Sequence, residues 1–372
     1  MRVASAGTNI HDFTSATRCF PASLPHIPYR ASATELAWID HRPVLHRVCE
    51  VGNRKSQRDA IPTWLNYSSA AWYGGPLPTP DGVQSEILSS FEVEQGRHDV
   101  IEPLTGVARH PLFLNAMLCS KDTVRHKWQS IPYKYDLRYL ILSSACPEKA
   151  NGRNATCRHR PHGARSRFYD LGCSMPYGER NKALREEDIL HGGGLGPSIA
   201  TFQELYRRRC IEFDDYYAWE AELKPPERWW AKLPAQLRAK MHFYNVPVAE
   251  GTRAQALDGT YQGGDSFLNL LMASAQPKDF VVVKIDIEGQ LGAPEMTIIE
   301  AIESRPELAA LVDELFFEGH FYSPEHCRPP SAYPCGWGSA ALNRTAMPGN
   351  IDDVLAHMHK LRTLGIRSHF WI

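Results

Sequence analysis

The chain has 372 residues, of which 43% are apolar and 22% charged, an ordinary globular mixture with enough apolar material for a core. Lys plus Arg total 41 and Asp plus Glu total 42, so the formal net charge is −1. Proteins that coat nucleic acid or anionic membranes need a basic excess, so this balance speaks against both classes. At roughly 150 residues per domain, the length allows two or three compact units.

The chain shows no clear targeting or metal-binding pattern. No stretch approaches the roughly 18 apolar residues of a transmembrane helix, so we expect no integral membrane segment. Residues 1–20 lack a sustained apolar run, so we expect no secretory signal. Three glycosylation sequons, at Asn66, Asn154 and Asn343, favour a secretory route only weakly, and the compartment stays open. The nine cysteines include no CxxC pair, which speaks against a structural zinc site.

The first third of the chain differs from the rest. Residues 1–135 are rich in proline and aromatic residues, carry dense turn signals and show weak periodicity. We expect an irregular, loop-rich N-terminal region or cap there, wrapped over the second half rather than folding alone. Residues 136–372 have the pattern of one α/β unit.

Apolar runs and helical patterns alternate in that second part. Strands are predicted at 139–142, 167–171, 210–214, 240–248, 280–287, 314–321 and 366–372. Amphipathic helices are predicted after the glycine-rich segment 192–198, around residues 296–302 and around residues 351–361. The alternation predicts a Rossmann-like, mostly parallel sheet with helices on both faces.

Polar residues lie at or near the carboxyl ends of four predicted strands, where ligands bind in such sheets. They are Asp170 and Gly172, Glu212 and Asp214, Asp286 and Glu288, and Glu318 and His320. Lys284 stands within an apolar run, where an ion-paired or snorkelling lysine is commoner than a catalytic one.

Four of these segments follow the order of a known family. The run 283–289 (VKIDIEG) resembles the KIDVEG signature of the FkbM-type methyltransferases. Segment 168–172 (FYDLG) resembles that family's first-strand motif, 211–214 (IEFD) its second-strand AFEP motif, and 314–318 (ELFFE) its fifth strand. The match covers residues 167–372, and the longer pattern is also similar to algal and protist relatives of the family.

The resemblance implies a seven-stranded class I methyltransferase fold and an S-adenosylmethionine-dependent O-methyltransferase. The acceptor would be a hydroxyl of a small molecule or a glycan. Asp170 and Gly172 would line the cofactor site, and Asp214 or Glu212 would hold the ribose hydroxyls. Asp286, Glu288 and His320 would position the acceptor hydroxyl and remove its proton.

Two departures leave alternatives open. Pro176 stands where the family has a second glycine, and residues 179–198 form an insertion before the helix. A non-catalytic, methyltransferase-like binding module with a remodelled cofactor loop is therefore a second hypothesis. A third is a carbohydrate-active enzyme that uses a divalent metal, Mg²⁺ or Mn²⁺, held by Asp286, Glu288, Glu318 and His320.

Overall fold

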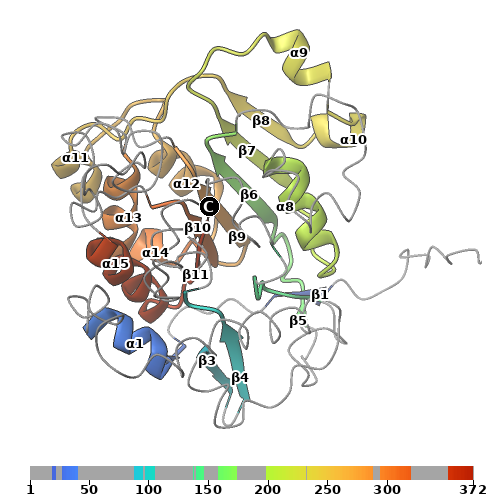
Figure 1. The fold of residues 1–372 in the computed structure, drawn as a ribbon. Helices are drawn as coiled ribbons and strands as arrows, with labels where there is room; N and C mark the ends of the chain where they lie inside the picture. The colour runs from blue at the N-terminus through green and yellow to red at the C-terminus, as the bar shows by residue number, and fades with distance from the viewer. Residues whose placement is uncertain are drawn as a thin grey trace, which may run out of the picture.

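A computed structural model gives the fold of the chain (Figure 1). The described residues are 19–21, 27–40, 88–94, 97–104, 137, 140–145, 158–173, 198–231, 233–287, 294–319 and 351–371.

The centre of the molecule is a six-stranded sheet in which every strand runs parallel to its neighbours. Its strands are β6 (Ser166–Leu171), β7 (Asp215–Trp219), β8 (Met241–Tyr244), β9 (Phe280–Ile285), β10 (Glu314–Phe317) and β11 (Arg367–Phe370). They are ordered β11-β10-β9-β6-β7-β8, which is the doubly wound, Rossmann-like order. The described residues add no seventh strand, and β10 pairs directly with β11. The strand order reverses between β6 and β9, and ligands of such sheets bind outside the carboxyl ends at that point.

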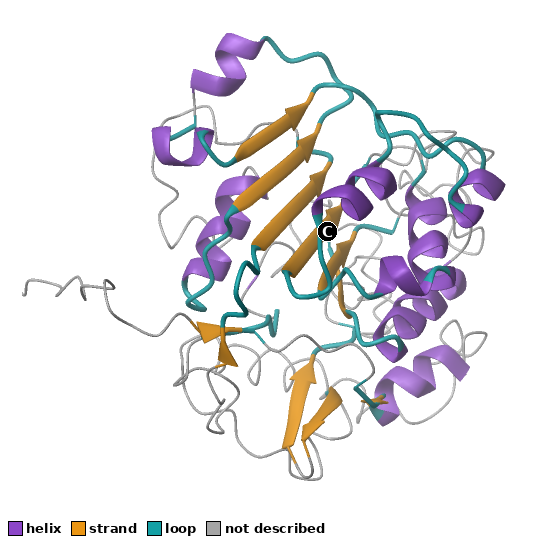
Figure 2. Ribbon diagram, turned by 180° about the vertical axis from the view of Figure 1, so that it is seen from behind, coloured by secondary structure: helices purple, strands orange, loops and turns teal. Residues whose placement is uncertain are grey.

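Helices cover both faces of this sheet (Figure 2). On one face, α8 (Ser198–Arg207) buries Ile199, Phe202 and Leu205 against Phe168 and Val282. The opposite face is covered by α12 (Phe267–Ser274), α13 (Glu295–Ser304), α14 (Pro306–Ala309) and α15 (Ile351–Thr363). Because both faces are covered, the central strand β9 reads as a nearly continuous apolar run.

Three short helices complete the connections on this half of the chain. They are α9 (Pro226–Ala231), α10 (Ala235–Arg238) and α11 (Arg253–Asp258). Trp229 of α9 is fully buried and stacks on Phe243 of β8, with ring centroids 3.8 Å apart. The tryptophan therefore serves packing of the sheet.

Most elements predicted from the sequence are confirmed. Strands β6, β8, β9, β10 and β11 and helices α8, α13 and α15 lie within or close to the predicted segments. The mostly parallel sheet with helices on both faces is confirmed as well.

Two predicted strands are wrong. Residues 140–142 are buried, but they form no strand. Their backbone is held by side chains from distant segments: the Ile141 amide donates to Glu102 Oε2 at 2.7 Å, and the Ser143 amide to the Glu314 carboxylate at 3.2 Å. The segment therefore has the apolar pattern of a strand, but it pairs with no neighbouring strand among the described residues.

The second error concerns residues 210–214, which precede β7 instead of forming it. Cys210 has a left-handed φ of 59° in the turn after α8. Ile211 and Phe213 are buried in the core, which explains the alternating pattern. Asp214 thus lies at the amino end of β7 rather than at its carboxyl end.

The described N-terminal residues include regular structure. A three-stranded antiparallel sheet joins β2 (Tyr29–Arg30), β3 (Ser89–Glu94) and β4 (Arg97–Ile101). Helix α1 (Ala33–Asp40) contacts α15, and β1 (Cys19–Phe20) pairs with β5 (Arg158–His159). In Figure 1, α1 and the β3–β4 hairpin lie below the large sheet.

Buried ion pairs join these N-terminal elements to the C-terminal helix and strand. Glu35 lies 2.9 Å from Arg362, Asp99 lies 2.8 Å from Arg367, and Glu102 lies 2.6 Å from His369 Nδ1. Arg362, Arg367 and His369 are each at most 1% exposed. Breaking a buried pair by removing one partner costs about 3–5 kcal/mol, so the two parts of the chain stabilise each other.

No helix in the described part of the chain is long and apolar enough to cross a membrane.

Candidate functional site

The carboxyl ends of the central strands bring polar residues from separate elements to one edge of the sheet. Backbone hydrogen bonds continue the ladder past the strand ends: Gly172 N to Trp219 O at 3.1 Å, Asp286 N to Leu171 O at 2.9 Å, Glu220 N to Tyr244 O at 3.1 Å and Glu318 N to Ile285 O at 2.9 Å. Gly172, Glu220, Asp286 and Glu318 are therefore neighbours along this carboxyl edge.

At Gly172 the ends of β6 and β9 approach each other closely. The φ of Gly172 is +99°, a region that side chains rarely adopt. A Cβ at this position would lie 1.8 Å from the Asp286 carbonyl oxygen. Only glycine combines this φ with the absence of a Cβ. The backbone that its missing side chain leaves accessible lies where the strand order reverses between β6 and β9.

A buried cluster of charges lies directly behind this contact. Asp170 and Lys284 face each other across β6 and β9, with Lys284 Nζ 3.2 Å from Asp170 Oδ1 and 2.7 Å from Asp286 Oδ2. The Ser198 hydroxyl at the start of α8 donates to the second Asp170 oxygen. Asp170 is fully buried, whereas the Asp286 side chain is 23% exposed. Asp286 is therefore the member of this cluster that a ligand can reach.

The charges of the cluster depend on one another. Burial alone would lower the pKa of Lys284, but Asp170 and Asp286 together raise it above its ordinary value. The lysine is therefore the cation of an ion pair, as the sequence pattern indicated. Cys173, directly after Gly172, is fully buried, and burial raises the pKa of its thiol. Such a thiol is not a nucleophile at neutral pH.

Glu220 is a residue that the sequence reasoning missed. It follows the last residue of β7, whose carbonyl accepts hydrogen bonds from the Gly172 and Cys173 amides. Its carboxylate accepts a hydrogen bond from the Glu222 amide at 2.7 Å. Burial raises the pKa of Glu220, and the nearby Asp170 adds to that shift. The signal for it was the apolar run 216–219 followed by an acid, which the misplaced strand at 210–214 obscured.

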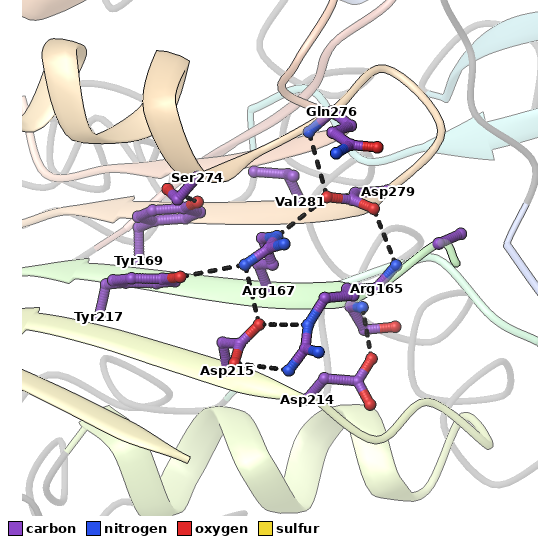
Figure 3. A network of polar contacts seen from close by, with 12 residues as sticks. Arg165, Arg167, Tyr169, Asp214, Asp215, Tyr217, Ser274, Gln276, Asp279 and Val281 are labelled. Carbon is purple, nitrogen blue, oxygen red and sulfur yellow. Dashed lines mark hydrogen bonds and ion pairs between the residues drawn. The ribbon is translucent and has the colours of Figure 1, made fainter.

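Asp214 lies at the opposite, amino edge of the sheet, and this corrects its expected place beside Gly172. Figure 3 shows its carboxylate turned toward the start of β6, where Oδ2 accepts from the Ser166 amide at 2.8 Å and pairs with Arg160. Glu212 is exposed in the loop before β7. Neither acid adjoins Gly172 or Asp286, so a ribose held at Gly172 would be out of reach of both.

The amino edge contains a second polar network, drawn in Figure 3. Asp215 accepts two hydrogen bonds from Arg165, each 2.7 Å long, and one from Arg167 at 2.8 Å. Asp279 accepts from the Arg165 amide at 2.8 Å and from Arg167 Nε at 2.9 Å. Bidentate arginine–carboxylate pairs of this kind fix geometry and use up the charges of both partners.

An open cavity of about 520 Å³ borders this network. Residues 160–165 and Asp214 line it. Its two arginines are already engaged, Arg160 with Asp214 and Arg165 with Asp215. Both arginines that line the cavity are therefore already paired, and the cavity lies at the edge of the sheet opposite to the strand-order reversal.

The remaining predicted site residues, Glu288 and His320, lie outside the described residues. Among the residues that the structure describes, no group of three or more His, Cys, Asp or Glu side chains is arranged to hold a metal ion. Comparison with family models, with curated proteins and with solved structures finds no match to this chain.

Proposed function

We propose that the chain is an S-adenosylmethionine-dependent O-methyltransferase that acts on a hydroxyl of a small molecule or a glycan. The observation that carries the proposal is the Gly172–Asp286 contact at the strand-order reversal, with the Glu220 acid beside it. A doubly wound sheet places a nucleoside cofactor at this point, where a glycine lets the backbone come close and an acid accepts the ribose hydroxyls. The FkbM-like segments 168–172 and 283–289 run to this point, whereas the third segment, 211–214, lies at the opposite edge of the sheet.

The charge of the carboxyl edge favours a cationic cofactor. Among the described residues, Asp170, Glu220, Asp286 and Glu318 contribute four carboxylates; Lys284 pairs with two of them, and Lys224 lies near Glu220. A dinucleotide would place a pyrophosphate against this acidic surface, which repels it. The sulfonium and ammonium groups of S-adenosylmethionine are attracted instead.

Each residue has a role that follows from its place. Gly172 admits the cofactor against the backbone, and Glu220 replaces Asp214 as the acid that accepts hydrogen bonds from the ribose hydroxyls. Asp170, which is buried, supports the site through Lys284 rather than touching the ligand.

When bound, the cofactor supplies an electrophilic methyl group. Asp286 lies at the mouth of the site and orients the acceptor hydroxyl for in-line attack. Its carboxylate is within reach of a hydroxyl proton in such a pose, and one of its oxygens is paired with Lys284. Glu288 and His320 remain the predicted partners for proton removal.

Calorimetry of the purified protein tests the proposal. We expect saturable heat with S-adenosylmethionine and with its demethylated product, and no heat with NAD⁺. The proposal is contradicted if neither S-adenosylmethionine nor its demethylated product gives heat in a sample that circular dichroism shows to be folded.

One observation favours the non-catalytic alternative. The Asp286 carboxylate is held at 2.7 Å by a buried lysine, so one of its oxygens is already engaged in an ion pair. A binding module would keep such a pair while doing no chemistry. Cofactor binding without release of the demethylated product, across a panel of hydroxylated acceptors, is the result that this alternative predicts.

A further inference from the structure

Lys284 is a charged residue in β9, a strand whose six residues are all buried. It is 1% exposed, and the residues that flank it along β9, Val283 and Ile285, are fully buried apolar side chains. A methionine would fill the same volume without the desolvation that a buried charge costs. Packing alone therefore does not account for a lysine here.

The contacts of Lys284 form a path from the interior to the edge of the sheet. Ser198 donates to Asp170, Asp170 receives Lys284 Nζ at 3.2 Å, and Lys284 Nζ lies 2.7 Å from Asp286. Exposure rises along this path, since the Asp170 side chain is 0% exposed, that of Lys284 2% and that of Asp286 23%. The shorter of the two ion pairs is the one to the exposed carboxylate.

We propose that Lys284 is a positioning residue, which holds the Asp286 carboxylate at the mouth of the cofactor site while Asp170 and Ser198 hold the lysine. This inference rests on the proposed function and adds the residue that orients its acid. The Asp286 backbone is held in place, because its amide donates to the Leu171 carbonyl and its carbonyl packs against Gly172. The remaining conformational freedom of Asp286 is therefore that of its side chain. An ion pair at 2.7 Å removes that freedom before a ligand arrives, and preorganisation of this kind raises affinity.

A purely structural role for Lys284 makes a different prediction. In that case the lysine would only neutralise the buried Asp170, and Asp286 would be incidental. Removing both buried charges together would then restore the protein completely. The two roles are separated by the double variant Asp170→Asn/Lys284→Met, which removes the buried pair and leaves Asp286 unchanged.

The experiment measures binding of S-adenosylmethionine by calorimetry, and thermal unfolding at about pH 6 and about pH 8. Lys284→Met, the double variant and wild type are compared. Lys240→Met is the matched control, because Lys240 Nζ donates to the Phe213 carbonyl at the opposite edge of the sheet.

We expect the double variant, which keeps the net charge of the cluster, to lose affinity by at least about tenfold, because the Asp286 carboxylate that attracts the cationic cofactor is no longer held in place. In Lys284→Met the melting temperature should fall between pH 6 and pH 8 relative to wild type, because Asp170 is left buried without a counter-charge and must take up a proton. The double variant should lose this pH dependence and regain stability. Lys240→Met should bind as wild type does.

Two results contradict the inference. Wild-type affinity in the double variant shows that the lysine does not position Asp286. The test does not require Lys284→Met to fold, since the double variant contains no orphaned buried charge. A wild-type protein that binds no cofactor overturns the proposed function and this inference together, whereas binding that is unchanged by the variants overturns the inference only.

Discussion

The two edges of the same sheet use carboxylates in opposite ways. At the amino edge, three aspartates, Asp214, Asp215 and Asp279, are matched by three arginines, Arg160, Arg165 and Arg167. At the carboxyl edge, the described residues Asp170, Glu220, Asp286 and Glu318 contribute four carboxylates, of which Lys284 pairs with two, and Lys224 lies near Glu220. The amino edge is a closed network, and the carboxyl edge carries an acidic surplus.

The difference separates structural acids from candidate ligand-binding ones. Matched arginine–carboxylate pairs tie together the starts of β6, β7 and β9, and they leave no charge for a ligand (Figure 3). The carboxyl edge keeps its surplus beside a glycine that no other residue can replace. A perturbed acid is thus informative only together with its partners and its place on the sheet.

The largest effect is expected from breaking the amino edge at Asp279. This residue is 3% exposed and accepts hydrogen bonds from the Arg165 amide and from Arg167 Nε. Asp279→Ala removes the buried acceptor of three hydrogen bonds, from Arg167 Nε and from the Arg165 and Gln276 amides, which should lower the free energy of unfolding by about 3–5 kcal/mol. Urea denaturation measures it.

Asp214→Ala is the matched control for that measurement. Its side chain is 28% exposed, so we expect a loss of about 1 kcal/mol. A loss for Asp279→Ala no larger than that of Asp214→Ala would show that the amino edge is not the closed network described.

Gly172→Ala should break the carboxyl edge. The added Cβ meets the Asp286 backbone and the φ of +99° is strained, so we expect about 3 kcal/mol of destabilisation or more, with loss of cofactor binding. Gly259→Ala, at a φ of +73° where the new Cβ meets only the Arg305 side chain, should cost about 1 kcal/mol and leave binding intact. Equal effects of the two substitutions, by urea denaturation, would contradict the special role of Gly172.

Glu250 is a buried acid whose partners are a hydroxyl and an amide instead of the arginines of the amino edge. Measuring protein stability at several pH values shows what such an acid contributes. Glu250, after β8, accepts from Ser266 Oγ at 2.6 Å and from the Leu268 amide at 3.1 Å. Burial raises the pKa of Glu250 to about 7, and these hydrogen bonds oppose the shift only in part. Because the folded pKa lies above the unfolded one, stability is highest below about pH 4.5 and is lost as the pH rises through about 7.

The loss over that range should be about 2 kcal/mol in wild type and absent in Glu250→Gln. Urea denaturation at several pH values measures both. Parallel pH profiles for the two proteins would show that Glu250 is not the group responsible.

The sequence predicted the parts of the fold that depend on local pattern. The buried run of β9 and the amphipathic helices α13 and α15 are determined by their own apolar spacing. Residues 140–142 have the same apolar character, but their amides bond to Glu102 and Glu314, which lie far away in the chain. No local pattern distinguishes that arrangement from a strand.

The candidate site was predictable in part. Asp170, Gly172 and Asp286 lie together because they stand at the ends of β6 and β9, two strands that the sequence predicted. The sequence placed β7 five residues too early, so Asp214 was predicted at the strand end where Glu220 lies. The cause is that Ile211 and Phe213 alternate as in a strand, although both are core residues of the segment before β7. A small register error therefore moved one acid from one edge of the sheet to the other.

The smallest change to the protein tests the central claim most directly. Glu220→Gln and Asp214→Asn each remove one negative charge, one at each edge of the sheet, and each keeps the shape of its side chain. We expect calorimetry with S-adenosylmethionine to show a loss of affinity of roughly tenfold to hundredfold for Glu220→Gln, as two hydrogen bonds to a charged group are weakened, and wild-type affinity for Asp214→Asn. Unchanged binding in Glu220→Gln together with lost binding in Asp214→Asn would place the cofactor at the amino edge and contradict the account.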